Sequence, residues 1–531
     1  MSTQKYKKTL KNIKSELSSF CPLSVLNEGI SYLGEFNNSE RPSESMPWII
    51  MLSIKLAMIE GAIGKRNITK VQFRQIINQI YHMQHLAADL QVGDPIFTLR
   101  PMIMQQAWYQ RPTHADMYTM IRQRLWFSEN NYYNNEFLRL TGLSIDSYIT
   151  MSLFIFQFAI TDAKNGIAEL NILRLLYSLC PSIPPTHIKN YFMLTGVRAQ
   201  DLPIFCKSNE LINEPQSEYF QPTTFRKKPL IIDGDKVYIF NSMVCTGGLA
   251  TLIPTLLKEK LAGAYKVHFG NDLESYIAKL FFDADIEVLN EKNIEAIYKQ
   301  NGLTGKVCDF MFGKDLNIII ESKAIEPGEI VLTTSDQALL KRSLPNSLIK
   351  SIKQGQKTAH NLKQTGNYRN GQFVLAIITH EDFWIATGDD ITKYIDPELL
   401  TEIQNEYGEI PIPFKDIIFF TINTFESLLE AHKNDGVNLE KSISKCIEAI
   451  NTPGGRRFTM AHVAEDVLGD KMAGHKFVLN EADKWISDLP GVMKNSAAFW
   501  GTDAQLLMAA HQKLMTSIDN QFERKGKAAG I

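Results

Sequence analysis

Apolar residues in the first part of the chain recur at steps of three and four residues. This spacing places them on one face of a helix, and it is clearest in segments 45–64, 71–90 and 168–180. Stretches rich in Asn, Pro, Ser and Thr separate these segments and are typical of turns. We therefore predict an all-α domain over residues 1–220, with a sensor or specificity role.

Beyond residue 222, short β-rich runs alternate with helical segments. Two such runs flank the turn-forming residues Asp233, Gly234 and Asp235, which predicts a hairpin, and a helix is expected over 250–261. The pattern of the chain therefore changes from all-α to mixed at this point.

A second helix is predicted to begin at Asn271 or Asp272, either of which could cap it. The segments 285–290, 294–300 and 371–380 have the composition of strands. We predict a mixed sheet flanked by helices over residues 221–430 and a helical region over residues 431–531. The fold class is multidomain α + α/β.

Composition sets few further limits. The 531 residues carry a formal net charge of -2, so any surface for nucleic acid must come from local clustering of Lys and Arg. The six cysteines show no spacing typical of zinc sites, which favours a reducing compartment. The longest apolar run, residues 148–160, is shorter than a bilayer span needs. We expect a cytoplasmic protein without a membrane partner.

Residues 306–324, KVCDFMFGKDLNIIIESKA, place charged residues inside two apolar runs. If these runs are antiparallel strands around a turn at Asp315, Asp309 lies opposite Glu321, and the two-residue period puts Lys323 on the same face as Glu321. Neighbouring carboxylates repel unless a cation lies between them, and Mg²⁺ prefers oxygen ligands. A lysine beside them could act on a water molecule or stabilise charge on a phosphate.

This arrangement resembles the PD-(D/E)XK nuclease superfamily, which has the restriction-endonuclease-like fold. The resemblance implies that Asp309 and Glu321 bind Mg²⁺ or, in its place, Mn²⁺, and that Lys323 assists the attacking water. The backbone carbonyl of Ser322 would complete the metal shell. Cys308 stands at the position of the proline for which the family is named.

The resemblance extends over residues 225–400. An acidic residue on the helix before the sheet is expected in the family, and Glu274 stands there. A later helix often presents Gln and a second polar residue to the site, and Gln356, Lys357 and His360 stand at those positions.

Residues 337–380 contain no Asp or Glu. Their basic side chains predict a cationic surface for the phosphate backbone, because a solvated helix face usually carries acidic partners within one turn. These residues are Lys341, Arg342, Lys350, Lys353, Lys357, Lys363 and Arg369.

The sequence thus predicts a Mg²⁺-dependent nuclease, with DNA as the expected substrate and endonucleolytic cutting as the expected mode. Defence against phage or mobile DNA is the leading biological hypothesis and rests on analogy with the superfamily. One alternative is a catalytically silent nuclease fold that binds nucleic acid or a protein; another is an interaction protein in which the hairpin is incidental. A homodimer and an activating protein partner stay open.

Overall fold

The structure is a computed structural model, and it describes residues 2–35, 45–88, 95–111, 113–127, 131–161, 167–211, 215–324, 328–366, 368 and 371–528. The chain forms two compact units. The first contains Met1–Val92, Met102–Lys260 and Asn480–Ile531, and the second contains Gly93–Pro101 and Leu261–Leu479. Each unit has its own β-sheet.

These units divide the chain differently from the segments that we predicted. The first unit continues past residue 220 to Lys260, so the hairpin around Gly234 belongs to it and not to the mixed-sheet region. The predicted C-terminal segment 431–531 is divided as well, because residues up to Leu479 belong to the second unit.

The first unit is mostly helical. Its helices are α1 (Ser2–Leu17), α2 (Pro22–Glu35), α3 (Pro47–Glu60), α4 (Lys70–Ala88), most of α5 (Pro95–Gln110), α6 (Thr113–Phe127), α7 (Asn131–Thr141), α8 (Ile145–Thr161), α9 (Ile172–Leu179), α10 (Pro185–Thr195), α11 (Leu202–Ser208), α12 (Pro215–Phe220), α13 (Ser242–Leu261), most of α24 (Lys476–Trp500) and α25 (Ala504–Ala528).

A small sheet interrupts the expected all-α pattern of the first unit. Its strands lie in the order β1-β4-β3-β2, with β1 (Ala168–Asn171), β2 (Gly196–Arg198), β3 (Leu230–Asp233) and β4 (Lys236–Ile239). The helix predicted over 168–180 is therefore partly wrong. Only α9 is helical, because the Asn171 side chain accepts a hydrogen bond from the Leu173 N–H and so caps a helix that begins at Ile172.

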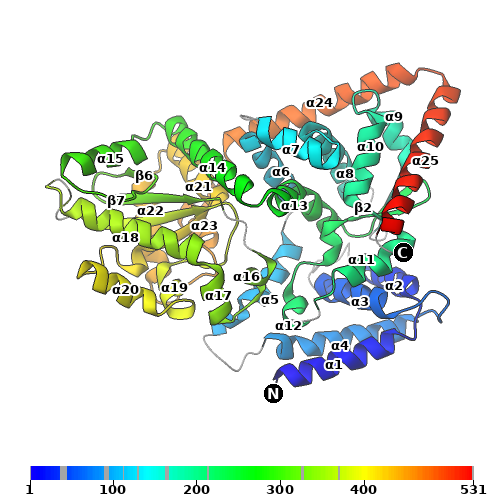
Figure 1. Ribbon diagram of the computed structural model, residues 1–531, viewed down its shortest axis with the longest axis horizontal. Coiled ribbons are helices and arrows are strands. Elements are labelled where there is room, and N and C mark those ends of the chain that lie inside the picture. Colours follow the sequence, from blue (N-terminus) through cyan, green and yellow to red (C-terminus); the bar gives the residue numbers. More distant parts are fainter. Residues whose placement is uncertain are drawn as a thin grey trace. The chain divides into compact units, whose positions relative to one another are not determined.

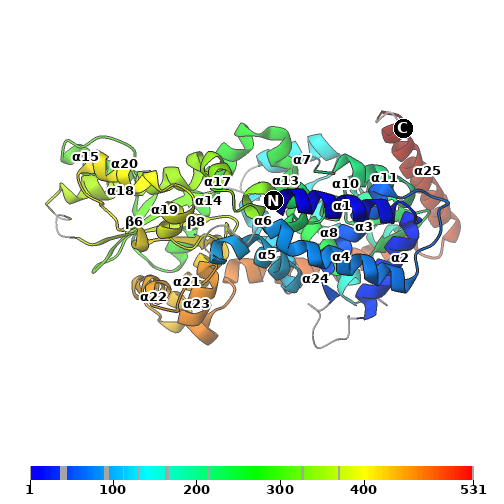
Figure 2. The same ribbon diagram turned by 90° about the horizontal axis from the view of Figure 1, so that it is seen from below.

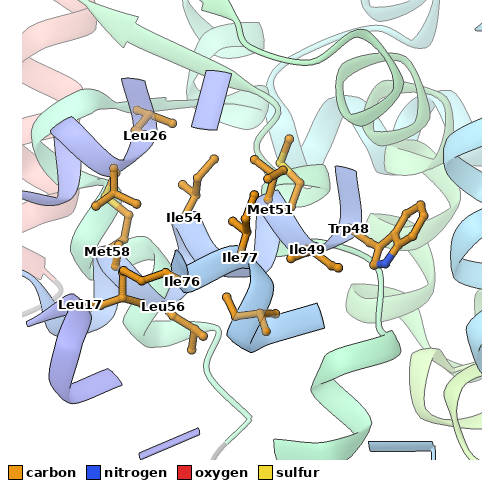
Figure 3. Close-up of a cluster of buried hydrophobic side chains, with 14 of the residues drawn as sticks. Leu17, Leu26, Trp48, Ile49, Met51, Ile54, Leu56, Met58, Ile76 and Ile77 are labelled. Atoms are coloured by element: carbon orange, nitrogen blue, oxygen red, sulfur yellow. The ribbon is translucent and has the colours of Figure 1, made fainter. Parts of the chain in front are cut away.

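The core of the first unit includes the inner faces of α1, α3 and α4. Figure 3 shows this cluster, with Ile54, Met51 and Ile77 drawn between neighbouring helices. The side chains of Ile54 and Ile76 are fully buried, as the helical spacing of apolar residues predicted.

The second unit surrounds a five-stranded mixed sheet in the order β5-β6-β7-β8-β9. The strands are β5 (Leu289–Asn290), β6 (Phe310–Phe312), β7 (Asn317–Lys323), β8 (Phe373–Thr379) and β9 (Ile417–Thr421). The helices are α14 (Gly263–Asp283), α15 (Glu291–Gln300), α16 (Glu329–Thr333), α17 (Gln337–Ser343), α18 (Lys350–Lys363), α19 (Gly388–Tyr394), α20 (Glu398–Tyr407), α21 (Ile422–Asp435), α22 (Leu439–Asn451) and α23 (Met460–Leu468).

Helices cover both faces of this sheet (Figure 1). Figure 2 shows β6 and β8 between α18 and α20 on one side and α21, α22 and α23 on the other. β5, β6 and β7 are successive antiparallel neighbours, whereas β7, β8 and β9 are parallel. Every residue of β8 is buried, as expected for a parallel strand that is covered on both faces.

Several predicted elements of the second unit are present and one is wrong. The helix that carries Leu273, Ile277 and Leu280 on one buried face is α14, although it begins earlier, at Gly263. The predicted strand over 294–300 is instead α15, because Asn290 and Asn293 form a capping box that starts a helix. These findings support the α + α/β class.

Among the described residues, no single helix is both long and apolar enough to cross a bilayer. The pair Asn131–Thr141 and Ile145–Ile160 meets that test only when taken together, and it is bent by 74°. All six cysteines are unpaired thiols.

Candidate functional site

The hairpin of β6 and β7 positions the predicted charged residues. Phe310 pairs with Ile320, and Phe312 pairs with Ile318. The paired residues end at Phe310 and Ile320, and Asp309 lies one residue before this pair, where its side chain contacts Ser322. The alignment of Asp309 with Glu321 stays a prediction. Phe281 of α14 lies against Phe310, with 5.6 Å between ring centroids, and this contact fixes the face of the hairpin opposite Glu321.

The hairpin turn is held by an acidic residue that the sequence did not reveal. The Glu440 carboxylate on α22 accepts hydrogen bonds from the backbone N–H groups of Lys314, Asp315 and Leu316, at 3.0, 2.9 and 2.7 Å. Gly313 enters the turn with φ of +114°, a conformation that other residues rarely adopt. Together these features fix the register that sets Asp309 beside Glu321.

Asp309 lies immediately before β6 and faces Ser322. Its Oδ2 accepts hydrogen bonds from both the backbone N–H and the hydroxyl of Ser322, each at 2.6 Å. These bonds hold the Asp309 carboxylate at the carboxyl end of β7. The carbonyl of Ser322 belongs to the same strand end, where β7 pairs with β8.

Glu321 is fully buried near the end of β7. Its Oε1 pairs with the Lys323 ammonium, whereas its Oε2 is buried and has no hydrogen-bond partner among the described residues. Burial and the Asp309 carboxylate raise the pKa of Glu321 to about 8, although Lys323 acts in the opposite direction. Buried carboxyl oxygens without a partner are rare in folded proteins and call for an explanation.

Glu274 on α14 completes the group. Burial, followed by the nearby carboxylates of Asp309 and Glu291, raises the pKa of Glu274 to about 7. Lys323 also acts on Glu274, in the lowering direction. The structure therefore brings Glu274, Asp309, Glu321 and Lys323 together, as predicted, in a site with more acidic than basic groups.

The donor set fits a hard divalent cation in part. Among the described residues no group of three or more His, Cys, Asp and Glu side chains is arranged to hold a metal ion. The predicted ligands are two carboxylates, Asp309 and Glu321, and one backbone carbonyl. Mg²⁺ is often bound through one or two carboxylates and keeps water or phosphate oxygens as its other ligands. The unpartnered Oε2 of Glu321 and the raised pKa are consistent with such a site.

The predicted cationic surface on α17 and α18 is partly wrong. Lys341 lies 2.8 Å from Asp396 and 2.6 Å from Glu398, and Lys353 lies 2.6 Å from Glu402. Lys363 lies 3.5 Å from Glu409. The acidic partners lie on or beside α20, more than 40 residues along the chain, where the spacing of charges within one helix could not reveal them.

Other predicted contact residues have different environments. The Gln356 side chain is fully buried and hydrogen-bonds to both the N–H and the carbonyl of Ile412, so it does not face nucleic acid. His360 stacks near Tyr407 and interacts with Gln364 at 2.9 Å. Both side chains link α18 to neighbouring parts of the second unit.

Arg342, Lys350 and Lys357 remain candidates for phosphate contacts. Arg342 and Lys350 are exposed, and the stem of Lys357 lies over Gly305. None of the three forms an ion pair with a described residue. Arg369 lies outside the described residues.

His380 is a site neighbour that the sequence reasoning missed. It directly follows β8, whose last residue Thr379 pairs with Lys323, and its ring meets Phe269 of α14 edge-on at 5.0 Å. The position of His380 directly after a buried parallel strand could have identified it as a site neighbour, because ligands commonly bind at the carboxyl ends of parallel strands.

Comparison of the chain with protein-family models, with curated proteins and with solved structures gives no match.

Proposed function

We propose that the second unit is a metal-dependent nuclease that hydrolyses phosphodiester bonds, with DNA as its substrate. The observation that carries this proposal is the convergence of Asp309, Glu321 and Lys323 at one strand end, where no described residue bonds to the buried Oε2 of Glu321. A purely structural site would gain stability from an apolar residue at position 321, because an unpaired buried carboxyl group costs free energy.

The order of elements supports the resemblance to the PD-(D/E)XK superfamily. α14, with Glu274, precedes β5, β6 and β7, and α18 then connects β7 to the parallel strand β8. This order agrees with a mixed sheet flanked by helices in which the acidic pair lies on adjacent strands. The name-giving proline is replaced by Cys308, which is fully buried.

The residues of this chain would divide the chemistry as follows. Asp309, Glu321 and the Ser322 carbonyl would hold the cation, which supplies a Lewis acid for the phosphate and lowers the pKa of bound water. Lys323 would orient the attacking water or stabilise the charge on the scissile phosphate. The water oxygen forms a bond to phosphorus as the bond to the leaving sugar oxygen breaks, and that oxygen takes up a proton.

The test is cleavage of supercoiled plasmid and of linear single-stranded DNA by the full chain with Mg²⁺, Mn²⁺ or EDTA. We expect cutting that requires the metal and that Asp309→Asn and Lys323→Met each abolish. Glu295→Gln on the exposed face of α15 is the matched control and should cut as the wild type does.

The outcomes separate the alternatives. Cutting that survives both substitutions would disprove the assigned site. Salt-sensitive DNA binding without cutting under any of these conditions would favour the catalytically silent fold. The product pattern would distinguish endonucleolytic from exonucleolytic cutting.

A further inference from the structure

A polar groove in the first unit runs along α25 beside α10. The two helices lie next to each other in Figure 1, and the groove has a volume of about 940 Å³. Leu514, Ile518 and Phe522 of α25 are buried at four-residue steps, so the opposite helix face is left to line the groove.

The groove is lined by cationic and neutral polar groups. Lys189 comes from α10, and Lys513 and Arg524 come from α25. The described lining contains no Asp or Glu, and none of these three cations forms an ion pair with a described carboxylate. This distinguishes them from Lys341 and Lys353 of the second unit, whose charges are neutralised by carboxylates of other elements.

Amide side chains stand between the cations. Gln512, Asn520 and Gln521 supply N–H donors and oxygen acceptors along the same helix face. Such groups, together with Lys and Arg, make most contacts to phosphate and sugar in complexes with nucleic acids. The described lining has no aromatic or large aliphatic side chain, which a membrane-surface site would need for insertion.

The length of the groove matches a run of phosphates. From Ala509 to Arg524 the helix rises about 22 Å, at about 1.5 Å per residue. Phosphates of one strand are spaced at about 3.4 Å along a duplex, so the groove has room for on the order of six of them. We propose that this groove binds the phosphate backbone of nucleic acid; the inference rests on the proposed nuclease function and gives the first unit a role in holding its substrate.

The experiment measures binding of fluorescein-labelled single-stranded and duplex DNA by fluorescence anisotropy, in EDTA and from about 50 to 250 mM KCl. The triple variant Lys189→Gln, Lys513→Gln and Arg524→Gln should bind at least tenfold more weakly at low salt. The slope of log Kd against log salt concentration should fall by about 2, because each lost phosphate contact removes about 0.7 to 0.9.

A matched control removes the same charge elsewhere in the first unit. Lys7, Lys8 and Lys11 are exposed on α1, and their triple replacement by Gln should leave the slope near the wild-type value. A second variant, with Gln512, Asn520 and Gln521 replaced by Ala, should weaken binding while the slope stays unchanged. Circular dichroism and melting temperature would show that each variant is folded.

Three results would overturn the inference. These are wild-type affinity and slope in the groove variant, an equal loss of slope in the α1 control, or binding of phosphatidylserine vesicles with no binding of DNA. The cleavage assay is scored separately. Cutting that depends on Asp309 but not on the groove would leave the nuclease proposal intact and overturn the groove proposal. Groove-dependent binding without cutting would support the groove proposal and contradict the nuclease proposal.

Discussion

Replacing Glu321 by glutamine should stabilise the second unit at alkaline pH, although it removes one of the two proposed carboxylate ligands. Burial and the Asp309 carboxylate raise the pKa of Glu321 from 4.5 to about 8. In the folded protein this carboxyl group therefore keeps its proton through neutral pH, whereas in the unfolded chain it loses the proton at much lower pH. Glutamine has nearly the same shape and is neutral throughout.

The magnitude follows from the interval between the two pKa values. From 4.5 to about 8, at about 1.4 kcal/mol per pH unit, the wild type loses about 5 kcal/mol of unfolding free energy that the glutamine variant does not lose. Because the folded pKa is raised, this stability is present below 4.5 and disappears as the pH rises through about 8. The two proteins should differ little near pH 5 and most near pH 9.

The assay needs a signal from the second unit alone. Trp384 is the one tryptophan in the sequence of that unit, so of the six ¹⁹F resonances that 5-fluorotryptophan labelling gives, the resonance of Trp384 reports the unfolding of the second unit. Denaturant titrations in EDTA at several pH values would compare wild type, Glu321→Gln and the exposed control Glu295→Gln. The control should follow the wild type at every pH.

The same denaturant titrations with Mg²⁺ test whether Glu321 is a metal ligand. Mg²⁺ at about 100 times its Kd should stabilise the wild type near pH 8 by about 2.7 kcal/mol and leave Glu321→Gln unchanged. Parallel stability curves for wild type and Glu321→Gln, or a less stable variant near pH 9, would refute the reasoning. Either result would mean that folding does not raise the pKa of Glu321.

Three further predictions concern side chains that hold the second unit together, and the Trp384 resonance measures each. Glu440→Gln should lower the unfolding free energy by about 1 to 3 kcal/mol, because a neutral amide accepts the three turn N–H groups more weakly; an unchanged value would contradict the anchoring role. Arg100→Met should lower the unfolding free energy by about 3 to 5 kcal/mol, because this fully buried guanidinium donates hydrogen bonds to three backbone carbonyls that would lose their partner. A decrease below about 1 kcal/mol would disagree with those contacts. Gln356→Leu should lower the unfolding free energy by about 2 kcal/mol, because its two hydrogen bonds to Ile412 are lost. The affinity for DNA should change less than twofold. A large loss of affinity in a folded variant would mean that Gln356 does contact nucleic acid.

The site hairpin could be predicted from the sequence because its constraints are local. A short turn between two apolar runs fixes the register of Phe310 with Ile320, and this register brings Asp309 to the end of β7, where it contacts Ser322. The β-branched run of Ile318, Ile319 and Ile320 also favours a buried strand. Glu274 could be placed for a similar reason, since it lies on a clearly amphipathic helix.

The surroundings of the site could not be predicted, because their partners are distant in the sequence. Lys353 and Glu402 are 49 residues apart in the sequence. Glu440 lies 125 residues from Asp315, from whose N–H it accepts a hydrogen bond. Spacing within one helix contains no information about such pairs. The expectation of a free cationic surface failed at Lys353 for this reason.

The central hairpin of the small sheet was predicted, but its edge strands β1 and β2 were missed for a different reason. These two strands have four and three residues, which is too short for a two-residue alternation to stand out. The chain pairs β2 with β3 and β1 with β4, so segments expected to be helical complete a sheet with a hairpin that was assigned to the next domain. Unit boundaries depend on these pairings, and the segments predicted from composition therefore ended in the wrong places.

Glu321 contributes less to the stability of the fold than an apolar residue would, and this points to a functional role. Position 321 continues the run of Ile318, Ile319 and Ile320 and lies in the buried part of β7, where an apolar side chain would pack without an electrostatic cost. Lys323 pairs with one oxygen of Glu321, and the other has no partner in the part of the chain that the structure describes. Asp309 increases the cost of ionising Glu321 instead of reducing it. The attraction of a bound cation would outweigh that repulsion, because Glu321 could then ionise beside one positive charge. The same cation would release protons on binding, so its affinity should rise between about pH 6 and pH 9, and an affinity independent of pH would mean that Glu321 is not a ligand.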